Sequence, residues 1–271
     1  MIKHDIHIHT HLSDCAAKNA FIADYITEAK DIGLEFIGFA DHAWDETVAG
    51  ASGWYAPQTF KRLAARRKEL KSIDKGGISV SLGAEGEFAN FILGLGADGA
   101  QYVDYVIIPH SHTHMKNFVI PASELETPKK HALFLLKSFI SLCEHESRDL
   151  FFGIAHPMVP VGVNKEYIEE VFRHISESDL NECAHAAKDN RRVLELNLSA
   201  VNTIPPERAE ACGLRRFFEA CARAGCEFFM GSDAHRVDNL KKYHAPSKRS
   251  VALMGLNESH FIAAKHRIPS V

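Results

Sequence analysis

The sequence predicts an α/β fold in which seven β/α units form an irregular, TIM-like barrel. Three observations support this fold class. Short apolar runs alternate with longer helical patterns along the whole chain, and no Pro/Gly/Ser-rich linker interrupts them. No Gly-x-Gly-x-x-Gly motif follows the first predicted strand, as a dinucleotide-binding Rossmann sheet would require. We therefore expect a single domain over residues 1–271.

The predicted strands are short, mostly apolar, and rich in β-branched and aromatic residues. Such runs are typical of parallel strands that helices cover on both faces. Polar residues collect at their ends rather than in their middles. The seven strands are expected at residues 4–9, 35–40, 78–84, 103–109, 150–156, 192–198 and 226–231.

A helical pattern follows nearly every strand. In the first pattern Ala23, Ile26, Ala29 and Ile32 are three residues apart, which places them on one helix face, and the pattern ends before Gly33. The second pattern is strongly basic on its outer face. Helices are expected at residues 21–32, 57–73, 128–146, 165–188, 206–224 and 247–265.

The composition limits the classes of function. A formal net charge of −4 argues against a nucleic-acid-binding protein. The six cysteines form no Cys-x-x-Cys pair and no disulfide framework, so we expect reduced thiols. The N-terminus lacks the pattern of a signal peptide, and no apolar run is long enough to span a membrane. We therefore expect a cytoplasmic protein without a membrane partner.

The first strand carries His7 and His9. Residues i and i+2 of a strand face the same side, so the two imidazoles project together. Two such imidazoles form half of a typical transition-metal site. The alternative is a polar N-terminus or part of a tag, but Ile6, Ile8 and the lack of a longer histidine run argue against a tag.

Nearly every other strand also ends in His, Asp or Glu. In a βα barrel the C-terminal ends of all strands open on one face, where reactive groups collect. Imidazole and carboxylate together favour Zn, Mn or Fe over Mg or Ca. These groups exceed the needs of one ion, so two or three divalent ions are expected. The candidate ligands are His7, His9, Asp14, His42, Glu85, His110, His112, His156, Asp233 and His235.

Several of these polar residues also have a structural interpretation. Asp41 could be a helix N-cap beside a surface His42, and one of Glu85 and Glu87 is expected to be only a rim charge. At most two of the three histidines at residues 110–114 are expected to be ligands. We expect structural hydrogen bonds from Glu195 and Asn197, an idle thiol at Cys15, and surface or helix positions for His4, His131 and His244.

The order of these motifs resembles the PHP (polymerase and histidinol phosphatase) family. The resemblance covers nearly the whole chain and depends on the combination, because no single motif is specific. The family implies a distorted (β/α)7 barrel with a phosphoesterase site of two or three metal ions. The matching segments are Asp5-x-His7-x-His9-Thr10 with Ser13-Asp14, Asp41-His42, Gly83-x-Glu85, the histidines after Asp104-Tyr105-Val106-Ile107, Ala155-His156-Pro157 and Gly231-Ser232-Asp233-Ala234-His235.

The resemblance also implies how the ions share their ligands. Family members vary between an Asp and a His one residue later in the first loop; here that residue is Cys15, so Asp14 is the expected ligand. Glu85, Asp233 and His235 are the expected catalytic residues. The first ion would use His7, His9, Glu85 and Asp233, the second Glu85, His156 and either His110 or His112, and the third Asp14, His42 and His235.

Together, the motifs and the resemblance predict a hydrolase that cleaves a phosphate ester with a metal-activated water. A small phosphomonoester resembling histidinol phosphate is the first choice, because single-domain family members of this size include histidinol-phosphate phosphatases. A nucleotide or other phosphodiesterase and a non-catalytic metal-binding barrel are the alternatives. An amidohydrolase is disfavoured because no Lys stands at a strand end. Of the cations near predicted strand ends, only Lys116 and Arg236 lie past the C-terminal ends, where the substrate would sit, and a solvated surface position is the favoured interpretation of both.

Overall fold

Seven parallel strands form the main sheet of the structure. The computed structural model describes residues 2–208, 210 and 212–271. Within these residues the strand order is β1-β2-β3-β6-β7-β8-β9. The strands are β1 (His4–Ile8), β2 (Phe36–His42), β3 (Ser79–Glu85), β6 (Tyr105–Pro109), β7 (Gly153–Ala155), β8 (Val193–Asn197) and β9 (Glu227–Gly231).

The first and last strands of this sheet lie side by side, which curves it into a nearly closed barrel. The backbone N–H of His9 donates to the carbonyl of Ala234 at 3.0 Å, and that of Asp233 donates to the carbonyl of His7 at 2.8 Å. The predicted distorted (β/α)7, TIM-like barrel is thereby confirmed. Because all strands run in one direction, their C-terminal ends share one mouth.

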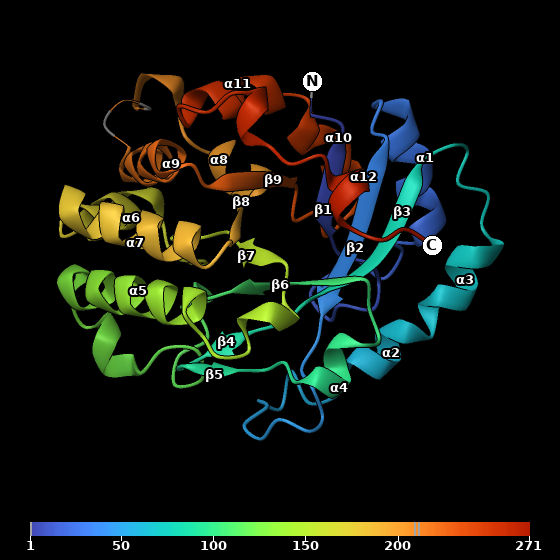
Figure 1. Cartoon of the computed structure of the whole chain (residues 1–271), viewed down its shortest axis with the longest axis horizontal. Helices are drawn as coiled ribbons and strands as arrows, with labels where there is room; N and C mark the ends of the chain where they lie inside the picture. The colour runs from blue at the N-terminus through green and yellow to red at the C-terminus, as the bar shows by residue number, and fades with distance from the viewer. Residues whose placement is uncertain (1, 209, 211) are drawn as a thin grey trace.

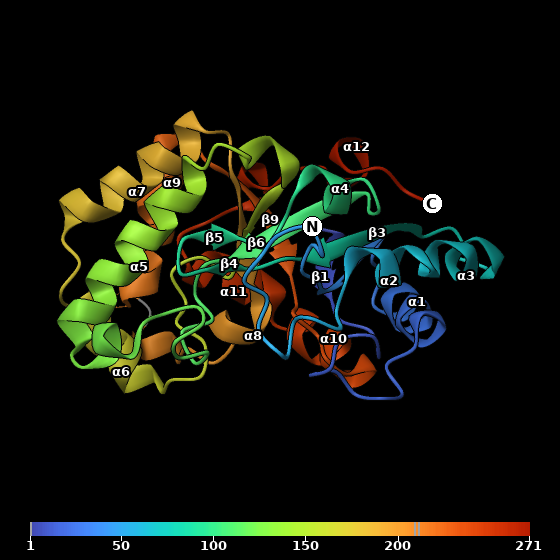
Figure 2. The same ribbon diagram turned by 90° about the horizontal axis from the view of Figure 1, so that it is seen from below.

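Helices cover the outside of the barrel in two groups, which Figure 1 and Figure 2 show on opposite flanks. None of the helices in the described ranges is long and apolar enough to cross a bilayer. One flank carries α5 (Pro128–Cys143), α6 (Lys165–Phe172), α7 (Glu177–Asp189) and α9 (Gly213–Ala224), and the other α1 (Ile22–Asp31), α2 (Phe60–Ala64) and α3 (Arg66–Ser72). The rest are α4 (Ala97–Ala100), α8 (Leu198–Val201), α10 (Val237–His244), α11 (Ser247–Leu253) and α12 (Ala264–Arg267).

Several predicted helices are interrupted. The pattern at 165–188 forms α6 and α7 because Ser176 caps a new helix: its hydroxyl accepts the N–H of Asp179, and the Asp179 carboxylate accepts the N–H of Ser176. The pattern at 247–265 breaks after Leu253, where Gly255 adopts a left-handed φ of 70°. Helix α10 and the hairpin of β4 (Phe88–Ala89) and β5 (Ile92–Leu93) lie outside the predicted elements.

Tyr105 fills the inside of the barrel. A Cβ atom added at Gly38 or at Gly83 would lie 2.2 Å from the Tyr105 ring or its hydroxyl, so both positions need glycine. The Tyr105 hydroxyl donates to the carbonyl of Ile6 at 2.7 Å. This packing fills the middle of the barrel with an aromatic ring.

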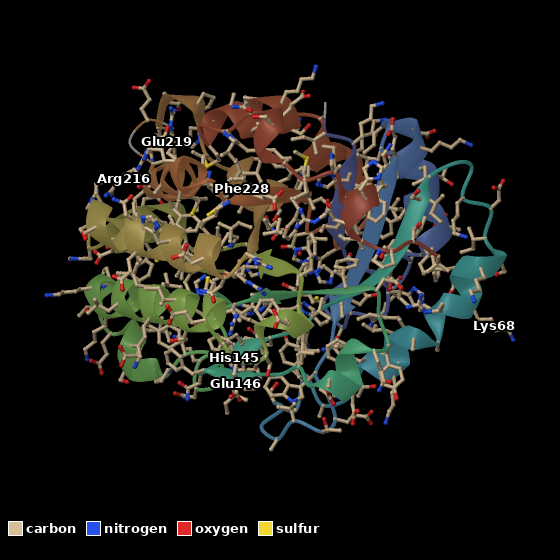
Figure 3. All side chains as sticks on the ribbon, viewed as in Figure 1. Lys68, His145, Glu146, Arg216, Glu219 and Phe228 are labelled. Carbon is tan, nitrogen blue, oxygen red and sulfur yellow. The ribbon has the colours of Figure 1, made fainter. Side chains whose placement is uncertain are left out.

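The C-terminal segment closes the opposite end of the barrel. The Ile262 N–H donates to the carbonyl of Phe228 at 2.9 Å, and the Val271 N–H donates to that of Val80 at 2.8 Å. A larger hydrophobic layer lies between strands and helices. Figure 3 shows Phe228 inside this layer and Lys68 pointing outward from α3. The six cysteines are free thiols, and all except Cys15 are buried.

Helix α5 carries a buried histidine whose charging we expect to destabilise the fold. His131 is fully buried, and among the described residues its Nε2 has no hydrogen-bond partner. Burial lowers its pKa from 6.5 to about 4. Because the unfolded chain binds the proton more readily, this residue should cost stability as the pH falls from 6.5 to 4.

Replacing this imidazole with an apolar side chain should remove the acid sensitivity. We expect His131→Leu to be more stable than the wild type by on the order of 2 kcal/mol near pH 4.5, and by less at neutral pH. Urea unfolding at both pH values measures the difference. His174→Leu, at an exposed position, is the matched control. An advantage of His131→Leu that does not grow on acidification would contradict this account.

Candidate metal centre

Seven side chains at the barrel mouth place their donor atoms in three overlapping groups. Within each group the donor atoms lie within 4.8 Å of one another. Glu85 and His9 each belong to two groups, so the groups form one continuous centre. The groups are His7, His9 and Glu85; Glu85, His112 and His156; and His9, His42 and His235.

Glu85, at the end of β3, is the central carboxylate. Its Oε2 lies 3.4 Å from Nε2 of both His7 and His9 and 3.1 Å from Nδ1 of His42. Its Oε1 lies 3.0 Å from Nε2 of His156 and 3.9 Å from Nε2 of His112. One carboxylate therefore faces two sets of imidazoles with its two oxygens.

Asp233 adds a second carboxylate to the side of the centre formed by β1 and β9. Its Oδ1 lies 3.2 Å from Nε2 of His9 and 3.7 Å from Nε2 of His7. It also lies 3.4 Å from Nδ1 of His235. The backbone of Asp233 is left-handed, with a φ of 56°. The four ligands expected for the first ion are thus all adjacent.

The Nδ1 atoms of five histidines in the centre are held by hydrogen bonds, which leaves Nε2 free to accept a metal. A metal-ligating imidazole typically donates its other ring N–H in this way. The Nδ1 partners are Glu195 Oε1 for His7 (2.8 Å), Ser13 Oγ for His9 (3.0 Å), Glu87 Oε2 for His112 (2.6 Å), Ser111 Oγ for His156 (2.8 Å) and the Asp233 carbonyl for His235 (2.9 Å).

The donor set fits a bound cation. The Nε2 atoms of His7 and His9 are 3.1 Å apart and both residues are fully buried. The Ser13 hydroxyl donates its proton to Asp41, so it must accept the proton on His9 Nδ1. The Glu195 carboxylate likewise accepts the proton on His7 Nδ1. With both rings neutral, two Nε2 lone pairs then face each other. A cation shared between them removes the repulsion, and nitrogen with carboxylate oxygen suits Zn, Mn or Fe.

The electrostatics of the centre favour positive charge. Burial disfavours the ionised form of Glu85, but His7 and His42 hold the pKa of its carboxyl well below the usual range. Burial also opposes the charged form of His7, yet the carboxylates of Glu195, Glu85 and Asp233 raise its pKa well above the ordinary value. The excess of buried carboxylate attracts either a proton or a metal ion.

Asp233 adjoins these groups, but two other predicted ligands have no donor atom in the centre. Asp14 is exposed, and its backbone N–H donates to the side chain of Gln58. His110 is buried against Phe139, with its Nε2 accepting the N–H of Met158 at 3.0 Å. Of the two candidate histidines after β6, the geometry therefore brings His112 to the centre, and no oxygen of Asp14 joins the third group.

Some expectations about supporting residues need correction. Glu87 is not a rim charge: it is fully buried and accepts hydrogen bonds from His112 and from the Tyr55 hydroxyl. Asp41 is not a helix N-cap but accepts hydrogen bonds from Thr10 and Ser13 in the first loop. His131 and His244 lie in helices, as expected, but on their buried faces, whereas His4 is a buried residue of β1 and so neither a helix nor a surface residue.

Glu195 makes the structural hydrogen bonds expected of it, but the sequence did not indicate that they hold two of the candidate ligands. Glu195 accepts the His7 ring N–H with one oxygen and the backbone N–H of His156 at 2.5 Å with the other. The sequence signal for this role is that Glu195 is a carboxylate within an otherwise apolar strand. Tyr55 had no comparable signal, since it lies in the loop after β2. Lys116 and Arg236 lie outside the centre, in agreement with the solvated interpretation: Lys116 is exposed, and Arg236 pairs with Asp238.

Solved structures with the same fold include two bacterial proteins. The histidinol phosphate phosphatase of Lactococcus lactis subsp. lactis Il1403, solved with zinc, L-histidinol and phosphate, has a TM-score of 0.61 and 16% identity, covering 94% of each chain. A candidate histidinol phosphatase from Listeria monocytogenes has a TM-score of 0.61 and 14% identity, covering 90% of this chain and 99% of that one. No protein-family model and no curated protein sequence matches this chain. The chain therefore shares the barrel fold of the histidinol phosphatases, which is the fold that its resemblance to the PHP family predicts.

Proposed function

We propose that this protein is a metal-dependent phosphoesterase that hydrolyses a small phosphate monoester. The observation that carries the proposal is the convergence of buried imidazole nitrogens on Glu85 at the barrel mouth. The ligands are His7, His9, His42, Glu85, His112, His156, Asp233 and His235, which the proposal assigns to two or three Zn, Mn or Fe ions.

The ions, when bound, supply an acidified water and neutralise the phosphate oxygens. The protein's own residues fix the geometry: Glu195, Glu87 and Ser111 hold the rings of three histidines in orientation. In the hydrolysis the water oxygen bonds to phosphorus, the bond to the leaving oxygen breaks, and that oxygen gains a proton. When two ions are bound, His235 is needed as a ligand by neither, and its Nε2, on a side chain that is 31% exposed, is the group we propose to carry that proton.

The surroundings of the centre make activity depend strictly on the ions. The Arg236 side chain is 64% exposed and lies 3.1 Å from Asp238, so it pairs with that carboxylate rather than with a group at the centre. The negative charge of the phosphate would therefore be met chiefly by the ions. L-histidinol phosphate is the first monoester to assay, because the Lactococcus lactis structure contains L-histidinol and phosphate.

A comparison of ester classes tests this proposal. Protein loaded with Zn or with Mn should release phosphate from monoesters, L-histidinol phosphate among them, and chelated protein should not. The kcat/KM for bis(p-nitrophenyl) phosphate, a diester, should be at least about tenfold lower than that for p-nitrophenyl phosphate. Faster diester cleavage would make the protein a phosphodiesterase. Failure on both ester classes, with ions bound, would leave a non-catalytic metal-binding barrel.

A further inference from the structure

A cavity of about 560 Å³ adjoins the metal centre. His156 and Asp233 form part of its wall, so the cavity opens directly onto the proposed site of phosphate cleavage. Its size falls within the range of pockets that hold organic ligands. A group attached to the phosphate would therefore extend into this space.

The wall of this cavity is mainly apolar. It includes Met158, Val159, Val161, Ile168, Ile204 and Leu214.

Apart from Asp233 of the metal centre, the charged residues that line the cavity contact other groups of the protein. The Lys165 ammonium donates to the carbonyl of Thr203, and Glu169 accepts the backbone N–H of Gly213 at 3.2 Å. Arg208 lies 3.7 Å from Glu166. The cavity thus offers apolar contact and little uncommitted charge.

One polar group in the wall lacks a partner. Asn197 is 2% exposed, and its Nδ2 makes no hydrogen bond in the described part of the chain. Its amide orientation is fixed, because Oδ1 accepts the N–H of Ala200 at 3.0 Å and the hydroxyl of Ser199 at 2.7 Å. A buried donor without an acceptor is costly, so the cavity's occupant is expected to supply one.

We propose that this cavity binds the leaving group of the phosphate ester, and that the leaving group is an uncharged, largely apolar alcohol with one acceptor oxygen for Asn197 Nδ2. This inference rests on the proposed phosphoesterase function and names its substrate class. L-histidinol, which carries an ammonium and an imidazole, matches such a wall less well than an apolar alcohol does.

Matched substrates test the chemistry of the cavity. Phenacyl phosphate carries a carbonyl beside its phenyl ring, and 2-phenylethyl phosphate lacks it. With metal-loaded wild-type protein, we expect kcat/KM for phenacyl phosphate to exceed that for L-histidinol phosphate and for glycerol 1-phosphate by about tenfold or more.

Variants of Asn197 isolate its hydrogen bond. Asn197→Asp keeps the oxygen that caps α8 but replaces the donor with an acceptor, and Asn197→Ser gives an uncharged N-cap without the amide. Both should lower kcat/KM for phenacyl phosphate about tenfold more than for 2-phenylethyl phosphate. Leu133→Asn, on the exposed face of α5, should leave the ratio unchanged. The product alcohol 2-hydroxyacetophenone should shift the NMR signals of the Asn197 side-chain amide.

The outcomes separate the two proposals. If monoesters are hydrolysed but the polar ones are preferred, or if the Asn197 variants lower both aromatic substrates equally, the cavity assignment is overturned and the phosphoesterase function stands. If no phosphate ester is hydrolysed by metal-loaded protein, the proposed function is overturned and this inference with it. An Asn197 amide signal that 2-hydroxyacetophenone does not move also counts against the cavity assignment.

Discussion

Glu85→Gln is expected to lose at least one bound ion and to lower kcat/KM for any accepted monoester by about 10³-fold. Glutamine has nearly the same shape, so the packing at the end of β3 should survive. What is lost is the negative charge that faces His7, His9 and His42 with one oxygen and His156 with the other. A neutral amide cannot join two groups of ligands in this way.

Elemental analysis and steady-state kinetics on the same preparation measure this effect. The matched control is Glu219→Gln on α9, where the native carboxylate accepts a hydrogen bond from Arg215 at 2.7 Å, away from the barrel mouth. That variant should keep wild-type ion content and turnover. Glu85→Gln protein that keeps both its full ion content and its full activity would exclude Glu85 as the central ligand.

Glu195→Gln is expected to weaken metal affinity or activity by about 10- to 100-fold, although Glu195 touches no ion in our assignment. Its carboxylate accepts hydrogen bonds from His7 Nδ1 at 2.8 Å and from the backbone N–H of His156. A glutamine oxygen can serve only one of these donors, and its amide group would oppose the other. Losing one buried hydrogen bond should also reduce stability by about 1–3 kcal/mol.

A titration with Zn or Mn separates this positioning role from a purely structural one. If Glu195 orients His7, the apparent metal dissociation constant should rise in Glu195→Gln even where urea unfolding shows that the protein is folded. The neighbouring Gly231 allows no larger side chain to compensate, since an added Cβ would lie 1.9 Å from the Glu195 carboxylate. Loss of stability alone, with metal affinity unchanged, would assign Glu195 to packing.

Much of the fold could be predicted from hydrophobic patterns. Short apolar runs locate each of the seven strands within a few residues, because parallel strands covered on both faces need apolar residues throughout. The boundaries of the helices were harder to predict from the sequence. The break between α6 and α7 depends on a reciprocal hydrogen bond between Ser176 and Asp179, which competes with a helical pattern that continues on both sides.

The centre could be anticipated because strand ends in a parallel barrel must share one mouth. This argument brings His7, Glu85, His156 and Asp233 together without any knowledge of the loops. It does not apply beyond the strands. His110 directly follows β6 but turns toward Phe139 of α5, whereas His112, two residues later, reaches the centre.

The supporting shell was the least predictable part. His244 belongs to a helix that the patterns missed, yet its ring bonds to Asp5 of β1 across 239 positions of the chain at 2.8 Å. Such a pair is set by how α10 packs on the barrel, and local sequence carries no signal of it. Asp14 is the opposite case, a residue with a sequence signal but no place in the centre. Its loop backbone turns the carboxylate outward although the surrounding motif predicts a ligand.

Anomalous X-ray diffraction from crystals grown with Zn or Mn gives the most direct test of the central claim. The account predicts an anomalous peak about 2.0–2.2 Å from Nε2 of both His7 and His9, with a second peak on the other side of Glu85 near His156. Crystals soaked in excess metal that show no peak among these side chains would contradict it.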